Sequence, residues 1–244
     1  MRLLFKLRAL GDFAYDLSYY SKMQGFLYST IRSLYPDLHE KKGFKFFCFS
    51  NIFPIGDFGE GDVRSFLVSS PDSVFIKALR HEFPAVVRVG EMCFSVEDVR
   101  PVSPSVDGGC VLMAATPIVV RIPSYNFGRY GIDSDKGYVF WRSDYSFEAF
   151  VKQLEENLFK KYNDFHNVRM EEQPLFDQYR LKKKPVCCHI PKDGSTYQVI
   201  GSLWEFPLQN LTKIQRKVLG FGLDAGFGEL NTQGFGFVNP VNGT

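Results

Sequence analysis

The feature that most constrains the fold of this sequence is an order of strands and helices that occurs twice. In the first half, basic and apolar residues alternate over 2–10, which is the period of a half-buried strand. Apolar residues at helical spacing follow, and Pro36 ends that helix. The elements expected in this half are a strand over 2–10, a helix over about 18–35, a β-prone run over 44–53, a strand over 64–68, a helix capped by Ser70 with Pro71 at its first position, and a strand or hairpin over 86–102.

A similar order follows in the second half. Ser143 or Asp144 is expected to open a helix whose apolar stripe runs to Leu158, and Gly220 is expected to end the last helix in a left-handed cap. The remaining expected elements are a β-like run over 111–122, a strand over 138–141, the two strands 186–190 and 197–204 of a hairpin that turns at 192–194, a final helix through 208–218 and a last strand over 234–238.

Two rounds of strand, helix, strands, helix and strand predict an α+β protein made of two tandem ferredoxin-like (βαββαβ) domains. A length of 244 residues fits two domains of ordinary size. We expect the boundary in the Pro- and Gly-containing segment 103–109, between an N-terminal domain of residues 1–107 and a C-terminal domain of residues 108–244 that carries a glycine-rich loop.

Composition narrows the class of protein. The longest uncharged apolar run, 108–120, is interrupted by Pro117 and is shorter than the roughly 20 residues of a membrane helix. Lys6, Arg8 and Asp12 interrupt any apolar signal segment at the start, so we expect a cytoplasmic protein without membrane association. The five cysteines form no CxxC pair, and we expect no metal and no cofactor. The net charge is only +2, so any binding of nucleic acid has to come from local patches.

The most distinctive segment is rich in glycine and lies near the end, over 220–237. Closely spaced glycines let backbone N–H groups approach an anion. No Gly-Lys-Ser/Thr follows, and the segment leads from a helix into a strand, so it is neither a Walker loop nor a dinucleotide fingerprint. Upstream, Lys213, Arg216 and Lys217 share one helical face. Phosphate binding would use both features, and a structural turn beside a solvated helix face is the alternative.

A second polar segment directly follows the first predicted helix. It contains His39, Lys41, Lys42 and Lys45. Histidine transfers protons near neutral pH, and lysine neutralises charge that develops on a phosphate. Tyr28 lies on the flank of the buried stripe of the preceding helix, where its hydroxyl could point toward this loop. An ordinary polar loop and a packing tyrosine are the alternatives.

Three segments together resemble the CRISPR-associated repeat-RNA processing endoribonucleases of the RAMP superfamily. They are 24–28, 38–47 and the glycine pattern over 226–236, and they occur at both ends of the chain in the order and spacing of that family. The glycine pattern marks the whole superfamily, including members that do not cut RNA. The set of Tyr28, His39 and Lys45 matches the nuclease family more narrowly.

The resemblance implies a metal-independent endoribonuclease that cleaves precursor CRISPR RNA within the repeat. Attack by the 2′-hydroxyl on the adjacent phosphate would leave a 2′,3′-cyclic phosphate and a 5′-hydroxyl end. By position, His39 is the implied general acid/base, Tyr28 activates or orients the 2′-hydroxyl, and Lys45 stabilises the pentavalent phosphorus. Lys41 and Lys42 are near enough in sequence that the choice of lysine stays open.

RNA contacts are expected from lysines, one arginine and four glycines, together with a basic row of Arg2, Lys6 and Arg8 on the first strand. The expected partners are CRISPR repeat RNA and other CRISPR effector subunits, and the chain is expected to be a monomer or a homodimer. Two other interpretations stay open: a non-catalytic repeat-RNA-binding subunit of a CRISPR effector complex, and a phosphate-binding metabolic enzyme. The predicted RNA-binding residues are Lys41, Lys42, Lys182, Lys183, Lys184, Lys213, Arg216, Lys217, Gly226, Gly228, Gly234 and Gly236.

Overall fold

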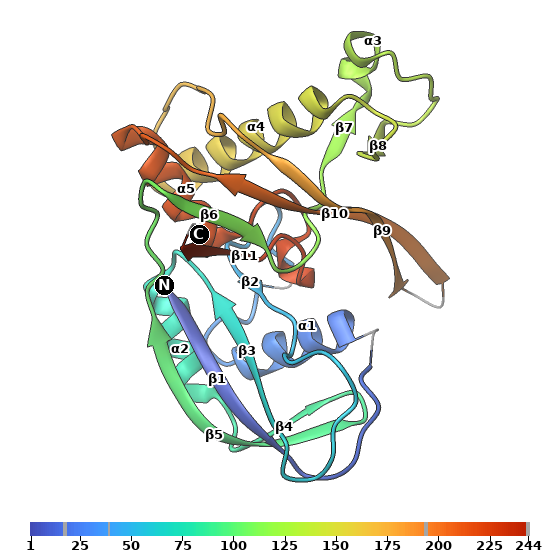
Figure 1. Cartoon of the computed structure of the whole chain (residues 1–244). Coiled ribbons are helices and arrows are strands. Elements are labelled where there is room, and N and C mark those ends of the chain that lie inside the picture. Colours follow the sequence, from blue (N-terminus) through green and yellow to red (C-terminus); the bar gives the residue numbers. More distant parts are fainter. Residues whose placement is uncertain (17–18, 39, 193–194, 243–244) are drawn as a thin grey trace.

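The computed structural model describes residues 1–16, 19–38, 40–192 and 195–242. Within these residues the chain forms two large antiparallel sheets, drawn one above the other in Figure 1, and two helices accompany each sheet. A small hairpin of β7 and β8 and the short helix α3 project beyond the upper sheet.

The first sheet has the strand order β2-β3-β1-β5-β4, and every neighbouring pair is antiparallel. Apart from β4, which extends one edge, the elements follow the βαββαβ order of a ferredoxin-like unit. The elements of this half are β1 (Arg2–Ala9), α1 (Tyr19–Thr30), β2 (Cys48–Phe49), β3 (Val63–Ser69), α2 (Ser73–Glu82), β4 (Val86–Val89) and β5 (Met92–Val102).

The second sheet has the order β11-β6-β10-β9 and is antiparallel as well. Its four strands, with α4 and α5, repeat the arrangement of β5, β1, β3 and β2 with α1 and α2. The elements of this half are β6 (Cys110–Ala114), β7 (Arg121–Pro123), η1 (Ser124–Asn126), α3 (Phe127–Tyr130), β8 (Tyr138–Phe140), α4 (Phe147–His166), β9 (Arg180–Lys192), β10 (Ser195–Pro207), α5 (Lys213–Ala225), η2 (Asn231–Gln233) and β11 (Val238–Asn242).

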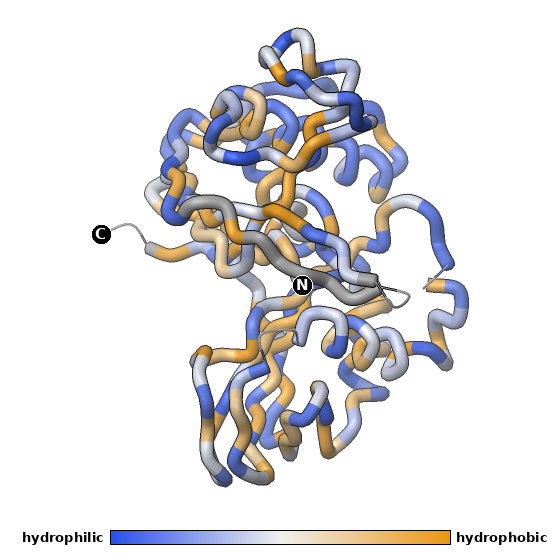
Figure 2. The backbone as a smooth tube through the Cα atoms, turned by 90° about the vertical axis from the view of Figure 1, so that its right-hand side faces the viewer, coloured by the Kyte–Doolittle hydropathy of each residue, from blue (hydrophilic) through white to orange (hydrophobic). Residues whose placement is uncertain are grey.

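The α+β class and the two ferredoxin-like units are therefore confirmed. Each unit has its own apolar core, in which the buried faces of α1 and α2, or of α4 and α5, pack on the strands. Figure 2 shows the hydrophobic segments running through the interior of both halves. The segment expected to join the units lies between the end of β5 at Val102 and the start of β6 at Cys110, and the boundary after residue 107 stays a prediction.

Two predicted helix starts are wrong because another side chain caps the helix. Asp72, and not Ser70, caps α2, since its Oδ1 accepts the N–H groups of Val74 and Phe75 at 2.8 and 3.2 Å. The hydroxyl of Ser70 instead donates to the carbonyl oxygen of Phe46 at 2.6 Å. The helix expected to be opened by Ser143 or Asp144 begins at Phe147, and its cap is Ser146.

The predicted end of the last helix and the predicted last strand are also displaced. Gly220 lies inside α5, which ends at the positive-φ residue Gly226. The strand expected over 234–238 begins only at Val238, because Gly234 and Gly236 adopt positive φ angles of 86° and 72° that interrupt an extended strand.

Arg2 links the two halves and is not part of an exposed basic row as predicted. Its side chain is buried, and its guanidinium donates to Asn239 Oδ1 at 2.5 Å and to the carbonyl oxygens of Leu223 and Val238 at 2.6 and 2.7 Å. It also lies 4.5 Å from the centroid of the Phe237 ring. None of the helices in the described part of the chain is both long enough and apolar enough to cross a bilayer.

Candidate active site

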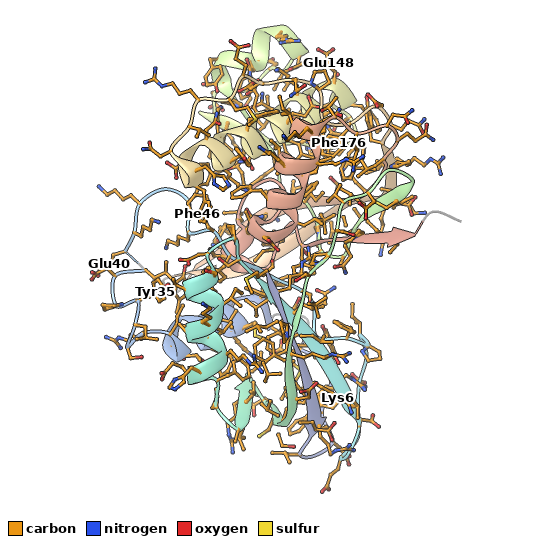
Figure 3. The ribbon with its side chains drawn as sticks, turned by 90° about the vertical axis from the view of Figure 1, so that its left-hand side faces the viewer. Lys6, Tyr35, Glu40, Phe46, Glu148 and Phe176 are labelled. Carbon is orange, nitrogen blue, oxygen red and sulfur yellow. The ribbon has the colours of Figure 1, made fainter. Side chains whose placement is uncertain are left out.

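A groove of about 780 Å³ lies beside the loop that follows α1. That loop forms one wall, the start of α2 contributes Asp72 and Phe75, and the end of α4 contributes Asp164 and Phe165. Figure 3 shows Tyr35, Glu40 and Phe46 along this loop, on the side where the two halves meet. The groove is therefore built from both ferredoxin-like units.

Two of the three predicted catalytic residues are neighbours beside this groove, which Lys45 lines and Tyr28 does not. Tyr28 lies on α1, half-buried, with its ring set edge-on against Phe47 at 5.7 Å between centroids. Lys45 lines the groove, and its Nζ lies 5.4 Å from the centroid of the Tyr28 ring. An ammonium at this distance from an aromatic ring is attracted to it. The Tyr28 ring and the Lys45 amine are thus neighbours, and the catalytic roles of both stay predictions.

The third predicted residue, His39, lies outside the described residues. Its neighbours Leu38 and Glu40 both line the groove that contains Lys45. The backbone N–H groups of Glu40 and Lys41 donate to the carbonyl oxygen of Asp37 at 3.1 and 2.9 Å. A role for His39 at the groove stays a prediction.

The two other lysines of this loop differ in their surroundings. Lys41 lines the groove with its Nζ 5.5 Å from the centroid of the Phe46 ring. Lys42 is exposed and lines neither this groove nor the cavity behind it. Of the three lysines that the sequence offers, Lys45 alone borders both spaces, which favours it for the catalytic role.

The second space is a cavity of about 420 Å³ between residues 43–47 and the glycine-rich loop, defined here as residues 226–236. Lys45 and Phe46 line it from one side, and Glu229 lines it from the glycine-rich loop. Arg121 also borders it, and its backbone N–H donates to Glu229 Oε1 at 3.0 Å while its side chain forms an ion pair with the same carboxylate. The cavity thus has charged groups of both signs around one lysine of the predicted catalytic set.

The glycine-rich loop is folded tightly on itself and on its neighbours. The four predicted RNA-binding glycines at 226, 228, 234 and 236 are all buried. A Cβ on Gly236 would overlap the carbonyl group of Phe227, and one on Gly228 would overlap that of Val119. The N–H groups of Phe227, Glu229 and Gly236 already donate to backbone carbonyl oxygens at 2.8 Å. Glycine here permits close packing, and direct contact between these glycines and RNA stays a prediction.

Sequence reasoning missed a buried lysine at the centre of this loop. Lys161, on α4, is 3% exposed, and its Nζ donates to the carbonyl oxygens of Gly226 and Gly228 at 2.9 and 2.5 Å and to Asn231 Oδ1 at 2.6 Å. Burial lowers the pKa of Lys161 to about 7. The sequence did contain a signal for it. Lys161 lies three residues after Leu158, on the apolar stripe of α4, where an apolar residue is expected and a charged one is unusual.

Comparison with known proteins places the chain in a family. The family model for the C-terminal part of the CRISPR-associated protein Cas6 matches residues 102–240. Over 99% of this chain and all of the relative, the chain is 32% identical to the CRISPR-associated endoribonuclease Cas6 2 of Methanocaldococcus jannaschii. The chain belongs to the Cas6 family. It is 30% identical to the CRISPR-associated endoribonuclease Cas6 of Haloferax mediterranei, over 100% of this chain and 95% of that one. This Cas6-family chain is an endoribonuclease, as predicted.

Solved Cas6 structures share the fold. The product of a Cas6-related gene from Pyrococcus furiosus has a TM-score of 0.72 at 19% identity, covering 100% of this chain and 99% of that one. A RAMP protein that binds different RNA substrates has a TM-score of 0.71 at 19% identity, with 99% of each chain covered. At this identity the likeness concerns the tandem ferredoxin-like fold.

The other predicted RNA-binding residues of this Cas6-family chain lie away from the groove. The start of α5 exposes three of them, Lys213, Arg216 and Lys217. The opposite end of α5 leads into the glycine-rich loop. Because a helix rises 1.5 Å per residue, Lys217 lies about 13 Å along the axis from Gly226.

On β9, Lys182 forms an ion pair with Glu205 at 2.8 Å and Lys183 is exposed, whereas the side chain of Lys184 is outside the described part. In the described residues, no group of three or more His, Cys, Asp or Glu side chains gathers as metal ligands would. The contacts of all these lysines with RNA stay predictions.

Proposed function

We propose that this Cas6-family chain cleaves precursor CRISPR RNA within its repeat, and that the cut is made at the groove beside Lys45. The observation that carries the proposal is that Lys45, next to the ring of Tyr28, lines a groove that Leu38 and Glu40, the neighbours of His39, also line. A phenol, an amine and an imidazole are sufficient for cleavage by an internal nucleophile.

In the proposed reaction the 2′-oxygen attacks the adjacent phosphorus and the bond from phosphorus to the 5′-oxygen breaks. The 2′-hydroxyl loses a proton and the 5′-oxygen gains one: His39 mediates one of these two transfers as general acid or base, water mediates the other, and Tyr28 orients the 2′-hydroxyl. The products are a 2′,3′-cyclic phosphate and a 5′-hydroxyl, and no water is consumed. The ammonium of Lys45 stabilises the negative charge on the pentavalent phosphorus.

Repeat RNA is the proposed ligand, and other CRISPR proteins are proposed partners, with the chain acting as a monomer or homodimer. Because phosphate contacts by lysine and arginine release counterions, affinity for the repeat should fall steeply with salt. The overall charge of +2 is too small to supply this attraction, so it has to come from the local lysines.

The test is cleavage of a repeat RNA from a CRISPR array, in EDTA, by wild type and by His39→Ala. General acid/base catalysis contributes about 10²- to 10⁴-fold, so His39→Ala should lower the rate by that factor while changing the dissociation constant by less than about threefold. His81→Ala is the matched control, because His81 is an exposed histidine at the end of α2, beside Glu82. Equal rates for wild type and His39→Ala would refute the role of His39.

A second arm tests the nucleophile. Replacing the 2′-hydroxyl by hydrogen at the scissile nucleotide should stop the cut while the RNA still binds. Products that carry a 5′-phosphate would mean that water, and not the 2′-oxygen, attacks the phosphorus.

A further inference from the structure

Phe46 adopts a backbone conformation that is rare for an aromatic residue. Its φ is +48°, in the left-handed region that favours glycine. Such outliers gather at functional sites, where the surrounding structure has to hold them. Here the hydroxyl of Ser70 donates to the Phe46 carbonyl oxygen at 2.6 Å, and the Phe46 ring packs edge-on against Phe165 of α4 at 5.1 Å.

This conformation of Phe46 determines the directions in which the side chains of Lys45 and Phe47 point. In a regular strand Lys45 and Phe47 would point to the same side. Phe47 is completely buried in the core of the first half, so an extended chain would direct Lys45 inward as well. The left-handed turn at Phe46 breaks that alternation and leaves Lys45 bordering the groove and the cavity.

Packing against its neighbours leaves part of the Phe46 ring exposed. It is half-buried, in contrast to Phe47 and Phe49, and Phe46 lines both the 780 Å³ groove and the 420 Å³ cavity. Lys41 holds its Nζ 5.5 Å from the centroid of this ring. Aromatic rings interleaved with lysines are the usual means of holding single-stranded nucleic acid, because a base stacks on the ring while the lysines meet phosphates.

We propose that Phe46 stacks on one base of the bound RNA, next to the phosphate that Lys45 meets, and so positions the strand for the cut. The proposal rests on the proposed function, since it requires RNA in the groove. Stacking accepts any base, so the ligand class is an unpaired nucleotide of the repeat beside the scissile phosphate. When RNA binds, the Lys41 ammonium would then leave the Phe46 ring and contact a neighbouring phosphate.

The alternative is that Phe46 only joins the two halves. Phe221→Leu is the matched control for that alternative, because Phe221 packs against Phe165 and faces Phe46 at 6.2 Å but lines neither the groove nor the cavity. Loss of interface packing alone should make Phe46→Leu and Phe221→Leu behave alike toward RNA.

The experiment measures affinity for a repeat RNA made uncleavable by a 2′-deoxy scissile nucleotide, with single abasic substitutions along it. Phe46→Leu should weaken binding of the intact RNA at least about fivefold, and Phe46→Trp should retain it. One abasic position beside the scissile phosphate should weaken wild type by a similar factor and have no further effect on Phe46→Leu. Phe221→Leu should bind like wild type and keep its sensitivity to that abasic position.

Two results would overturn the proposal. One is an abasic scan in which wild type shows no sensitive position beside the scissile phosphate, and this arm needs no variant to fold. The other is a set of affinities in which Phe46→Leu and every abasic substitution weaken binding additively, or in which Phe221→Leu weakens binding as much as Phe46→Leu does. A wild type that cuts the intact repeat but shows either result loses only the stacking site, whereas failure to bind or cut the repeat at all refutes the proposed function.

Discussion

Lys45 is the lysine that the geometry selects, and the selection can be tested at the scale of one residue. Removing a group that stabilises charge in a transition state typically costs about 10²- to 10³-fold in rate. Lys45→Met should therefore lower the single-turnover rate of repeat cleavage by about that factor. Lys42→Met is the control, since Lys42 is exposed on the same loop and borders neither space, and it should stay within about threefold of wild type. Equal losses for both would mean that the loop acts only through its total charge.

The buried Lys161 predicts a dependence of stability on pH. Its pKa is about 7 in the folded protein, against an ordinary value of 10.5, so between these values the unfolded chain binds more protons than the folded one. Stability therefore rises with pH across that window and is lost as pH falls toward 7. In Lys161→Met this contribution is absent.

The measurement is the free energy of unfolding in urea for both proteins from pH 6.5 to 9.5. The value for wild type minus the value for Lys161→Met should increase with pH. A difference that does not change with pH would show that the three oxygen acceptors of Lys161 keep its amine protonated over the whole range from pH 6.5 to 9.5.

At this scale the sequence identifies part of the site and misses the rest. Tyr28 and Lys45 follow from residue type, their place beside a helix stripe and a family pattern. Lys161 could have been noticed as a charge on an apolar stripe, yet its three oxygen partners come from a loop 65 to 70 residues away. The left-handed turn at Phe46 has no local sequence signal, because phenylalanine ordinarily avoids it.

At the scale of elements, the glycine-rich loop depends on glycines that leave no room for a side chain. Gly236 has a φ of +72°, and an added Cβ would overlap the backbone of Phe227. Strain at such a φ and the overlap together should make Gly236→Ala less stable by about 2–5 kcal/mol. Gly220→Ala is the control, because Gly220 lies inside α5 with open space around it, and it should stabilise the protein by about 0.4–1 kcal/mol. Thermal and urea unfolding measure both, and an unchanged Gly236→Ala would contradict the packing described here.

The limits of prediction at this scale come from competition between neighbouring signals. The periodic helices and the alternating first strand are all present, since one face of each is buried, but α1 ends at Thr30 and α5 begins only at Lys213. Helix ends were less accurate: Ser70 and Asp72 are both good caps, and the tertiary bond from Ser70 to Phe46 decides between them. Gly220 was mistaken for a cap because a glycine inside a helix and one at its end look alike in sequence.

At the scale of the whole molecule, the order of elements predicted two ferredoxin-like units but not how they join. Helices and strands are coded by local periodicity, whereas the junction depends on contacts between residues far apart in the chain. Tyr20 of α1 stacks on Phe235 of the glycine-rich loop at 5.2 Å, and the groove and cavity exist only because residues from both halves meet. The site is therefore a property of the assembled pair.

Arg2 is a fully buried polar link in that junction, and its removal tests whether the halves depend on it. Burial lowers the pKa of Arg2 to about 10, which leaves it charged at neutral pH. Arg2→Met keeps most of the side-chain volume but leaves the oxygens of Leu223, Val238 and Asn239 without their donor. A buried acceptor left without its donor costs about 1–3 kcal/mol, so the free energy of unfolding should fall by at least that amount.

Lys6→Met on the same strand is the control, because Lys6 is half exposed in its ion pair with Glu97, and its removal should leave the free energy of unfolding almost unchanged. Since both spaces around Lys45 require the two halves to meet, Arg2→Met should also weaken repeat binding. If Arg2→Met lost stability but bound repeat RNA as wild type does, the link would stabilise the fold without shaping the site. If the two variants were equally stable, the apolar contacts between the halves would be sufficient to hold them together.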